Sequence, residues 1–293
     1  GIYAYMPLLW KVLKKITLIV EEELSKKGCL QTLLPQLQPS DVWEKSGRWK
    51  SYTEGEGIMF SLKDRQGKEL GLGPTHEEVI TQIIAQTIHS YKQLPINIFQ
   101  IQTKFRDEIR PRFGLMRSRE FIMKDGYSFH SSKEDLAAFY ERMGKAYENI
   151  FKNCGLKTLG VEADSGSIGG ASSKEFMVTA DVGEDSILFT ESGSYAANIE
   201  KAISIATKPI PLKKLSSELL NTPNQTSITD ICKKNNLDSS QIVKSVVFLA
   251  KFENKKELPI IAFIRGDQHI NEVKLFNILN SKYSSNLINL KII

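Results

Sequence analysis

The stretch from Ile96 to His130 constrains the fold most, because apolar and polar residues alternate in it on both sides of a basic loop. The alternation predicts one strand over Ile96–Glu108 and another over Arg119–His130, joined by a loop rich in Pro, Gly and Arg over Ile109–Ser118. Successive side chains of a strand point to opposite faces, so each strand has one apolar and one polar face. We therefore predict a β-hairpin that presents a row of polar side chains.

The polar face of this hairpin has the residue types of a ligand platform. It carries Gln100, Gln102, Lys104, Arg106 and Glu108 on the first strand, and Arg117, Arg119, Phe121, Met123, Asp125 and Tyr127 on the second. An arginine beside an exposed aromatic ring suits a nucleotide, because the guanidinium can bind phosphate while the ring stacks on a base. We favour a ligand platform over the alternative, which is a solvated charged strand.

Other patterns predict the elements around the hairpin. In the first half these are a helix from Pro7 to Gly28, an extended segment over Leu30–Pro35, a hairpin over Gly57–Leu72, a helix that begins at Thr75 with Glu78 completing a capping box, and a long helix from Ser131 or Ser132 to Gly155. Extended segments follow over Leu156–Ala163, Phe176–Ala180 and Ile187–Phe189, with a Gly/Ser loop over Ser165–Ser173.

The residue composition of the chain changes after Glu200. The stretch Lys208–Gln225 is rich in Pro, Ser, Asn and Thr and indicates a linker. A second α/β unit is predicted beyond it, with a helix over Ile228–Asn235, strands over Ile242–Ala250 and Ile260–Arg265, and a helix from Asn271. We divide the chain into two domains, residues 1–195 and residues 196–293, and expect the second domain to be incomplete.

Composition narrows the class of protein. Hydrophobic residues make up 41% and charged residues 25% of 293 residues, as in soluble globular proteins. No apolar run approaches the roughly 18 residues that a membrane span needs. The formal net charge of +5 is modest, but positive residues concentrate between Lys104 and Lys124. Three widely spaced cysteines suit a reducing cytoplasm, and four scattered histidines predict no zinc site.

Several ordered motifs resemble a known family. Phe105–Glu108, the basic loop, Arg117 and Phe121 resemble motif 2 of class II aminoacyl-tRNA synthetases. Longer runs resemble bacterial-type prolyl-tRNA synthetases over essentially the whole chain: Gly73–Thr81, Tyr91–Pro95, Arg110–Gly114, Arg119–Asp125 and Gly166–Gly170. The resemblance implies an α+β fold, in which the antiparallel-sheet catalytic core of a class II synthetase is followed by part of an inserted α/β editing domain.

The resemblance also implies roles for the hairpin residues. Arg106 would hold the ATP α-phosphate and the proline carboxylate, Glu108 the adenine amino group, Phe121 the adenine ring, and Arg117 the outer phosphates. Mg²⁺ would accompany the phosphates. We therefore expect Mg²⁺ to bind through the ATP phosphates and expect no metal site formed by protein side chains alone.

Further roles concern proline, tRNA and a partner subunit. Thr75 and Glu77 would contact the proline imino group, and Met123 and Tyr127 would line its pocket. Thr75 can also be the helix cap, and core packing explains Met123 and Tyr127 equally well. The resemblance places Arg110 and Arg112 at the tRNA acceptor end and Pro35 in a homodimer interface. We interpret Ser165–Ser173 as a plain turn.

The second domain carries a motif of its own. Ile242–Val247 and Arg265–Val273 resemble the inserted domain that hydrolyses mischarged alanyl-tRNA(Pro). Lys244 falls at the functional lysine of that domain. Without the motif, a lysine beside an apolar strand is most often a surface residue whose stem packs on the strand.

The resemblance to prolyl-tRNA synthetases thus implies a cytoplasmic enzyme that uses ATP and Mg²⁺ to join proline to tRNA(Pro), with an editing activity. Two alternatives are a stand-alone aminoacyl-tRNA deacylase and a non-catalytic tRNA-binding paralogue. Intact Thr75, Glu77, Arg106 and Glu108 argue against both. We expect both ends to be cuts through a longer protein, and the 293-residue chain alone to form no adenylate.

Overall fold

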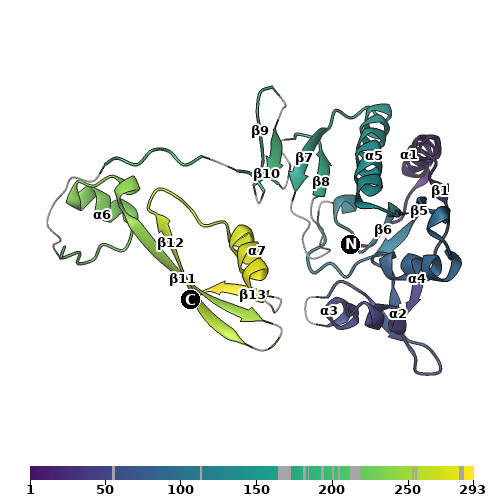
Figure 1. The fold of residues 1–293 in the computed structure, drawn as a ribbon, viewed down its shortest axis with the longest axis horizontal. Helices are drawn as coiled ribbons and strands as arrows, with labels where there is room; N and C mark the ends of the chain where they lie inside the picture. The colour runs from purple at the N-terminus through teal and green to yellow at the C-terminus, as the bar shows by residue number, and fades with distance from the viewer. Residues whose placement is uncertain are drawn as a thin grey trace. The chain divides into compact units, whose positions relative to one another are not determined.

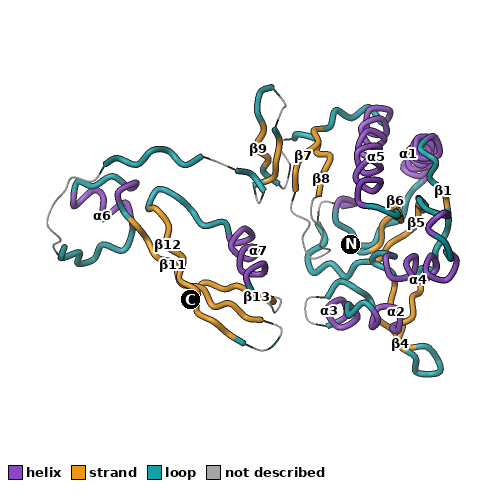
Figure 2. Tube along the Cα trace, viewed as in Figure 1, coloured by secondary structure: helices purple, strands orange, loops and turns teal. Residues whose placement is uncertain are grey.

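The computed structural model describes residues 1–54, 57–112, 114–163, 173–180, 183, 185–192, 195–199, 201–203, 205–211, 219–252, 254, 256–283 and 287–293. The chain divides into two compact units, residues 1–158 and 159–293, whose elements Figures 1 and 2 show. Phe113 and all but the last residue of the predicted loop Ser165–Ser173 lie outside the described residues.

The predicted hairpin is the centre of the first unit. Strands β5 (Ile96–Phe105) and β6 (Glu120–Phe129) pair antiparallel along their whole length, with Ile96 opposite Phe129 and Phe105 opposite Glu120. The short strand β1 (Leu30–Gln31) pairs parallel with β5. The hairpin is confirmed, and each strand is one to three residues shorter at its ends than the alternation predicts.

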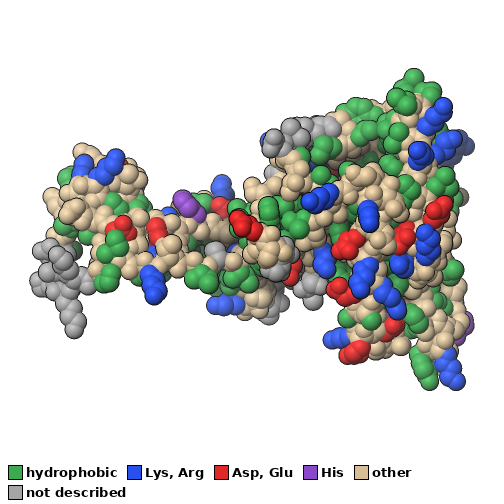
Figure 3. Space-filling view, turned by 90° about the horizontal axis from the view of Figure 1, so that it is seen from above, with side chains coloured by type: hydrophobic (Ala, Val, Ile, Leu, Met, Phe, Trp, Pro, Cys, Tyr) green, Lys and Arg blue, Asp and Glu red, His purple; other side chains and the backbone are tan. Residues whose placement is uncertain are grey.

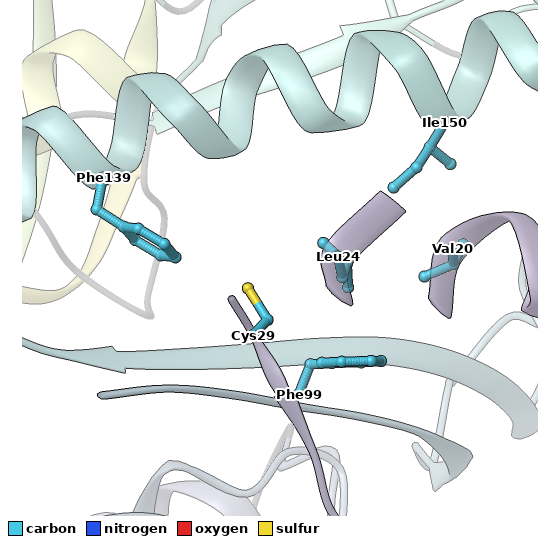
Figure 4. Packing of buried hydrophobic residues seen from close by; sticks show 6 residues of the cluster. All are labelled: Val20, Leu24, Cys29, Phe99, Phe139 and Ile150. Carbon is cyan, nitrogen blue, oxygen red and sulfur yellow. The ribbon is translucent and has the colours of Figure 1, made fainter. Parts of the chain in front are cut away.

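Two long helices cover the apolar face of this sheet. Helix α1 (Pro7–Lys26) begins with a proline, whose fixed φ suits the first helical turn, and Gly28 follows it with φ 76°. Helix α5 (Lys133–Asn153) begins after Ser132, whose hydroxyl accepts a hydrogen bond from Asp135 N, as predicted. The core between the helices and the sheet, shown in Figure 4, consists of Val20, Leu24, Cys29, Phe99, Phe139 and Ile150.

A smaller sheet and two short helices lie nearer the other face. Its strands are in the order β2 (Leu37–Pro39), β4 (Glu69–Leu72) and β3 (Ser61–Lys63), so the second predicted hairpin is also confirmed. Helices α2 (Ser40–Lys45) and α3 (Trp49–Thr53) enclose a core of Trp43, Trp49 and Met59. Periodicity does not reveal these two helices, because neither spans two turns.

The helix predicted to begin at Thr75 begins two residues later. Helix α4 is Glu77–Thr87, its N-cap residue is His76, and no side chain caps it. The predicted capping box of Thr75 and Glu78 is therefore wrong. Single 3₁₀ turns occupy Tyr91–Gln93, Gly114–Met116 and Ser239–Gln241.

The second unit contains two sheets. The first has the strand order β8 (Ser173–Met177), β7 (Leu159–Ala163), β10 (Ala196–Asn198) and β9 (Ile187–Phe189). The second has the order β12 (Glu257–Arg265), β11 (Val243–Phe252) and β13 (Leu287–Ile292). Helix α7 (Glu272–Lys282) packs on one face of the second sheet, and α6 (Ile228–Asn235) has the predicted bounds.

The mixture of helices and mainly antiparallel sheets confirms the predicted α+β class. None of the helices within the described residues is both long enough and apolar enough to cross a membrane. The domain boundary predicted after residue 195 would separate β10 from the strands it pairs with, β7 and β9. A boundary after Asn198, which lies within the second compact unit, keeps that sheet whole, and we propose this boundary between the two predicted domains.

Candidate functional site

A turn of the chain, Gly73–Glu78, lies on the polar face of the β5–β6 hairpin. Backbone Phe105 N donates to Gly73 O at 3.2 Å, and His76 N donates to the Tyr127 hydroxyl at 3.1 Å. The His76 ring, fully buried, places Nε2 2.9 Å from Pro35 O. The turn is thereby fixed to both hairpin strands and to the segment that follows β1.

Beneath this turn the polar face is a buried network that converges on Asp125. Its Oδ2 accepts hydrogen bonds from Gln100 Nε2 at 2.9 Å and from the Tyr127 hydroxyl at 2.5 Å. Lys104 Nζ forms an ion pair with Asp125 Oδ1 at 2.9 Å, although the atoms are out of line for a hydrogen bond. Gln100 and Lys104 are fully buried, so this part of the face supports the site and is neither solvated nor open to a ligand.

Burial shifts the titration of three groups in the network. Burial lowers the pKa of the Lys104 ammonium, and the neighbouring Asp125 carboxylate acts in the opposite direction. The pKa of His76 is also lowered, first by burial and then by the Lys104 cation. The pKa of Tyr127 is raised by burial and by Asp125. At neutral pH the Tyr127 hydroxyl therefore keeps its proton and His76 is neutral.

Thr75 and Glu77 meet directly at the start of α4. The Thr75 hydroxyl donates to Glu77 Oε2 at 2.5 Å, so it orients the carboxylate and does not cap the helix. Thr75 O accepts from Gln38 Nε2 at 3.0 Å, and Trp43 Nε1 donates to Gln38 Oε1 at 2.7 Å. The Glu77 side chain keeps 39% of its surface exposed and lies in the first turn of the helix, where a negative charge is favourable.

Arg106 binds the other end of the same turn. Its Nε and one terminal nitrogen lie 3.4 and 3.5 Å from Pro74 O, and its backbone N donates to Arg119 O at 2.9 Å. The guanidinium carbon lies 5.5 Å from the centroid of the Phe121 ring. The structure thus brings together a carboxylate, a guanidinium and an aromatic ring around residues 74–77.

The remaining predicted residues of the hairpin are less tightly placed. Glu108 is half-buried and its backbone N donates to Arg106 O at 2.8 Å. Arg110, Arg112 and Arg117 are exposed, and Arg112 N donates to Arg117 O across the loop at 3.3 Å. Met123 is half-buried opposite Gln102. Figure 3 shows Lys and Arg side chains interspersed with Asp and Glu on the visible face of the first unit, at the right.

Lys244 belongs to the second unit and lies near the beginning of β11. It is half-buried, pairs across the sheet with Ile264, and shares a face with the buried Phe248 and Ala250. Nearby, Arg265 Nε forms an ion pair with Asp267 Oδ1 at 2.6 Å, which lowers the pKa of Asp267.

Sequence reasoning assigned no role to Arg48, His76, Gln38 or Asp125, which hold the turn in place. The sequence signals for Asp125 were its position on the polar face of β6 and its place at the end of the family-like run Arg119–Asp125. Within the described parts of the chain, no group of three His, Cys, Asp or Glu side chains is arranged to hold a metal ion.

Comparisons with known proteins identify relatives of this chain. The model of the family described as tRNA synthetase class II core domain (G, H, P, S and T) matches residues 60–270. Proline–tRNA ligases of Prochlorococcus marinus are 72% identical in strain MIT 9515 and 66% identical in strain NATL1A. Each match covers all 293 residues of this chain and 49% of the relative, so the chain spans about half the length of these relatives.

Two solved structures are similar in fold. A Giardia lamblia prolyl-tRNA synthetase in complex with prolyl-adenylate has a TM-score of 0.51 and 26% identity, over 55% of this chain and 33% of that one. A Cryptosporidium parvum prolyl-tRNA synthetase complexed with L-proline and AMP has a TM-score of 0.53 and 17% identity, over 60% of this chain and 35% of that one. These likenesses confirm the predicted catalytic-core fold.

Proposed function

The chain belongs to the class II tRNA synthetase core family, and from that premise we propose that it provides the amino-acid-activating site of a proline–tRNA ligase. The relatives that are 72% identical over the whole chain carry this name, which supports the choice of proline. The reaction would join proline to ATP as prolyl-adenylate and then transfer the prolyl group to the 3′ end of tRNA(Pro).

One observation carries the proposal: Glu77 and Arg106 are fixed at the two ends of one short turn. A free amino acid is a zwitterion, so its site needs an anion for the imino group and a cation for the carboxylate. Thr75 orients Glu77, and Pro74 O holds Arg106. Both charges are therefore placed before the substrate binds, and preorganised charge is the main source of catalysis in sites of this type.

The nucleotide would bind beside Arg106. The Phe121 ring offers a stacking surface for adenine, with Glu108 within the same strand–loop segment to accept from its amino group. Arg106 would stabilise the α-phosphate and Arg117 the outer phosphates. Mg²⁺ would bind the ATP phosphates, so that the substrate is the Mg²⁺ complex of ATP. The proline carboxylate oxygen attacks the α-phosphorus, and the bond to pyrophosphate breaks.

Tyr127 and Met123 would line the side of the site that receives the proline ring. The Tyr127 hydroxyl is already engaged with Asp125 and His76 N, so only its ring is available to an apolar substrate. The proline complex of the Cryptosporidium neighbour supports a pocket for this amino acid in the shared fold.

The proposal extends to partners. The exposed Arg110 and Arg112 would meet the acceptor end of tRNA(Pro). Apolar residues on the outer side of α1, including Leu8 at 78% and Leu18 at 57% exposure, support a homodimer. All three cysteines are free, which suits the cytoplasm. Lys244 would act in hydrolysis of alanyl-tRNA(Pro) in the second unit.

Proline-dependent exchange of pyrophosphate into ATP tests the proposal in a protein of the relatives' full length. Arg106→Ala should reduce the exchange by about a hundredfold or more, because it removes a charge that stabilises the transition state. Glu77→Ala should raise the KM for proline much more than that for ATP.

Arg65→Ala, at an exposed turn between β3 and β4, serves as the control and should leave the exchange unchanged. Exchange that responds to another amino acid but not to proline would refute the substrate. A wild-type protein that catalyses no exchange but hydrolyses alanyl-tRNA(Pro) would favour a stand-alone deacylase. A wild-type protein that binds tRNA but has neither activity would favour a non-catalytic paralogue.

A further inference from the structure

Arg48 is a half-buried cation that the proposed mechanism does not use. It precedes α3, and 25% of its side chain is exposed. Its guanidinium carbon lies 4.5 Å from the centroid of the Tyr52 ring and 5.3 Å from that of Trp43. One terminal nitrogen also donates to the Tyr52 hydroxyl. Two aromatic rings and a hydroxyl therefore fix the plane of this guanidinium.

The other terminal nitrogen of Arg48 faces the two carboxylates at the start of α4. It donates to Glu78 Oε1 at 2.9 Å and lies 4.0 Å from Glu77 Oε2. The Glu78 side chain is only 3% exposed and also accepts from the Ser46 hydroxyl at 3.0 Å. A buried carboxylate beside Glu77 would repel it, and Arg48 supplies the compensating charge for both.

Glu77 Oε2 therefore has two neighbours, the Thr75 hydroxyl at 2.5 Å and the Arg48 nitrogen at 4.0 Å. Among the described residues nothing donates a hydrogen bond to the other oxygen, Oε1. The two contacts on Oε2 restrict the carboxylate to one orientation and direct Oε1 away from Arg48. Because 39% of the Glu77 side chain is exposed, Oε1 is the carboxylate oxygen that we expect a substrate cation to reach.

We propose that Arg48 is a positioning residue for amino-acid recognition: it orients Glu77, so that Oε1 receives the imino cation of the substrate. This inference rests on the proposed function, since it assigns Arg48 to the amino-acid side of that site. Arg48 touches neither the substrate nor ATP. Its removal therefore affects binding of the amino acid and spares binding of the nucleotide.

Arginine suits this place better than lysine. The planar guanidinium stacks on aromatic rings while its separate nitrogens reach a hydroxyl and two carboxylates. A lysine keeps the charge but has one donor group and stacks less well. Arg48→Lys should consequently retain part of the effect, whereas Arg48→Met keeps an unbranched apolar side chain and loses the charge.

Steady-state exchange kinetics in the full-length protein test the assignment. Arg48→Met should raise the KM for proline about tenfold or more, with the KM for ATP within about twofold of wild type. Arg48→Lys should fall between wild type and Arg48→Met. The matched control, Arg65→Met on the exposed β3–β4 turn, should change neither constant. Equal changes in both KM values, or an unchanged KM for proline, overturn the proposal.

A double-mutant cycle separates positioning from a general structural role. In a Glu77→Gln background, Arg48→Met should have little further effect on the KM for proline, because the residue through which it acts is already neutral. Additive effects overturn the proposal. Should Arg48→Met not fold, Tyr52→Phe removes only the hydroxyl that Arg48 binds, and it should raise the KM for proline two- to threefold, again sparing ATP.

Inactive wild-type protein would refute the proposed function itself. Active wild-type protein with an Arg48→Met variant of unchanged proline KM would refute only the role of Arg48. The two failures are therefore distinguishable in one set of assays.

Discussion

Asp125 is the residue on which the buried contacts of the site converge. One carboxylate binds Gln100, Tyr127 and Lys104, and the Tyr127 hydroxyl passes the connection on to His76 N. Removing one partner of a buried ion pair typically costs about 3–5 kcal/mol, because the other charge is left uncompensated. The network therefore gives the turn that carries Glu77 a fixed position, which a binding site built on a loop otherwise lacks.

The alternation of β5 correctly predicted which side chains share a face, but not that Lys104 is buried. A lysine on a polar strand face is normally solvated. Its burial depends on the Gly73–Glu78 turn, which covers that face and lies some thirty residues earlier in the chain. The residues around Lys104 give no indication that a segment so distant in sequence packs against them. The roles of Arg48 and His76 were missed for the same reason.

His76 should make the stability of the first unit depend on pH. Its pKa in the folded state is lowered from the ordinary value of 6.5, so below pH 6.5 the unfolded state binds more protons than the folded state. The stabilisation is present above pH 6.5 and is lost as the pH falls toward the folded-state pKa. The loss can reach about 1.4 kcal/mol per pH unit.

Urea unfolding followed by tryptophan fluorescence at pH 7.5, 6.5 and 5.5 measures this dependence. All three tryptophans, Trp10, Trp43 and Trp49, belong to the first unit, so the signal reports on that unit. His76→Gln removes the titrating ring and should flatten the curve below pH 6.5. Equal pH dependence in wild type and variant would contradict a role of His76 in the pH dependence of stability.

At the scale of elements, sequence patterns predicted the long ones well. Apolar spacing located α1 and α5 because three or more helical turns repeat the pattern, and Gly28 and Gly155 mark their ends with positive φ. Elements of three to six residues, such as α2 and β10, have too few repeats to show a period. Thr75 gave a false cap signal because its hydroxyl binds a side chain.

Helix α1 offers a matched pair of substitutions on one element. Leu24 is fully buried in the core under the β5–β6 sheet, whereas Leu18 is 57% exposed on the same helix. Leu24→Ala should reduce the free energy of unfolding by about 2–5 kcal/mol, because it leaves a cavity. Leu18→Ala should cost less than about 1 kcal/mol in dilute protein.

The same tryptophan-detected urea titration compares the two variants. Similar losses for both would contradict the placement of α1, since they would mean that its outer side is also covered in the folded protein. A loss for Leu18→Ala that grows with protein concentration would instead reveal a subunit contact on that side.

At the scale of the whole molecule, the two proposed chemistries belong to separate compact units. Arg106 and Glu77 lie in residues 1–158, and Lys244 lies in residues 159–293. The family motifs predicted both sets of residues, because such motifs preserve the order of functional side chains over long stretches of chain. They say nothing of the contacts inside each unit, which here came from the hydrogen bonds of Asp125 and Arg48.

This separation predicts a double dissociation of activities in the full-length protein. Lys244→Ala should slow hydrolysis of alanyl-tRNA(Pro) about tenfold or more, because it removes the cation proposed to act in that reaction, and leave proline-dependent exchange within about twofold. Arg106→Ala should reduce exchange by about a hundredfold or more and leave the hydrolysis within about twofold. Lys251→Ala, another lysine of β11 with a more exposed side chain, provides the control and should leave both activities unchanged. Unchanged hydrolysis in Lys244→Ala would mean that this residue is an ordinary surface lysine whose stem packs on β11. Equal losses of both activities in either variant would contradict the independence of the two sites.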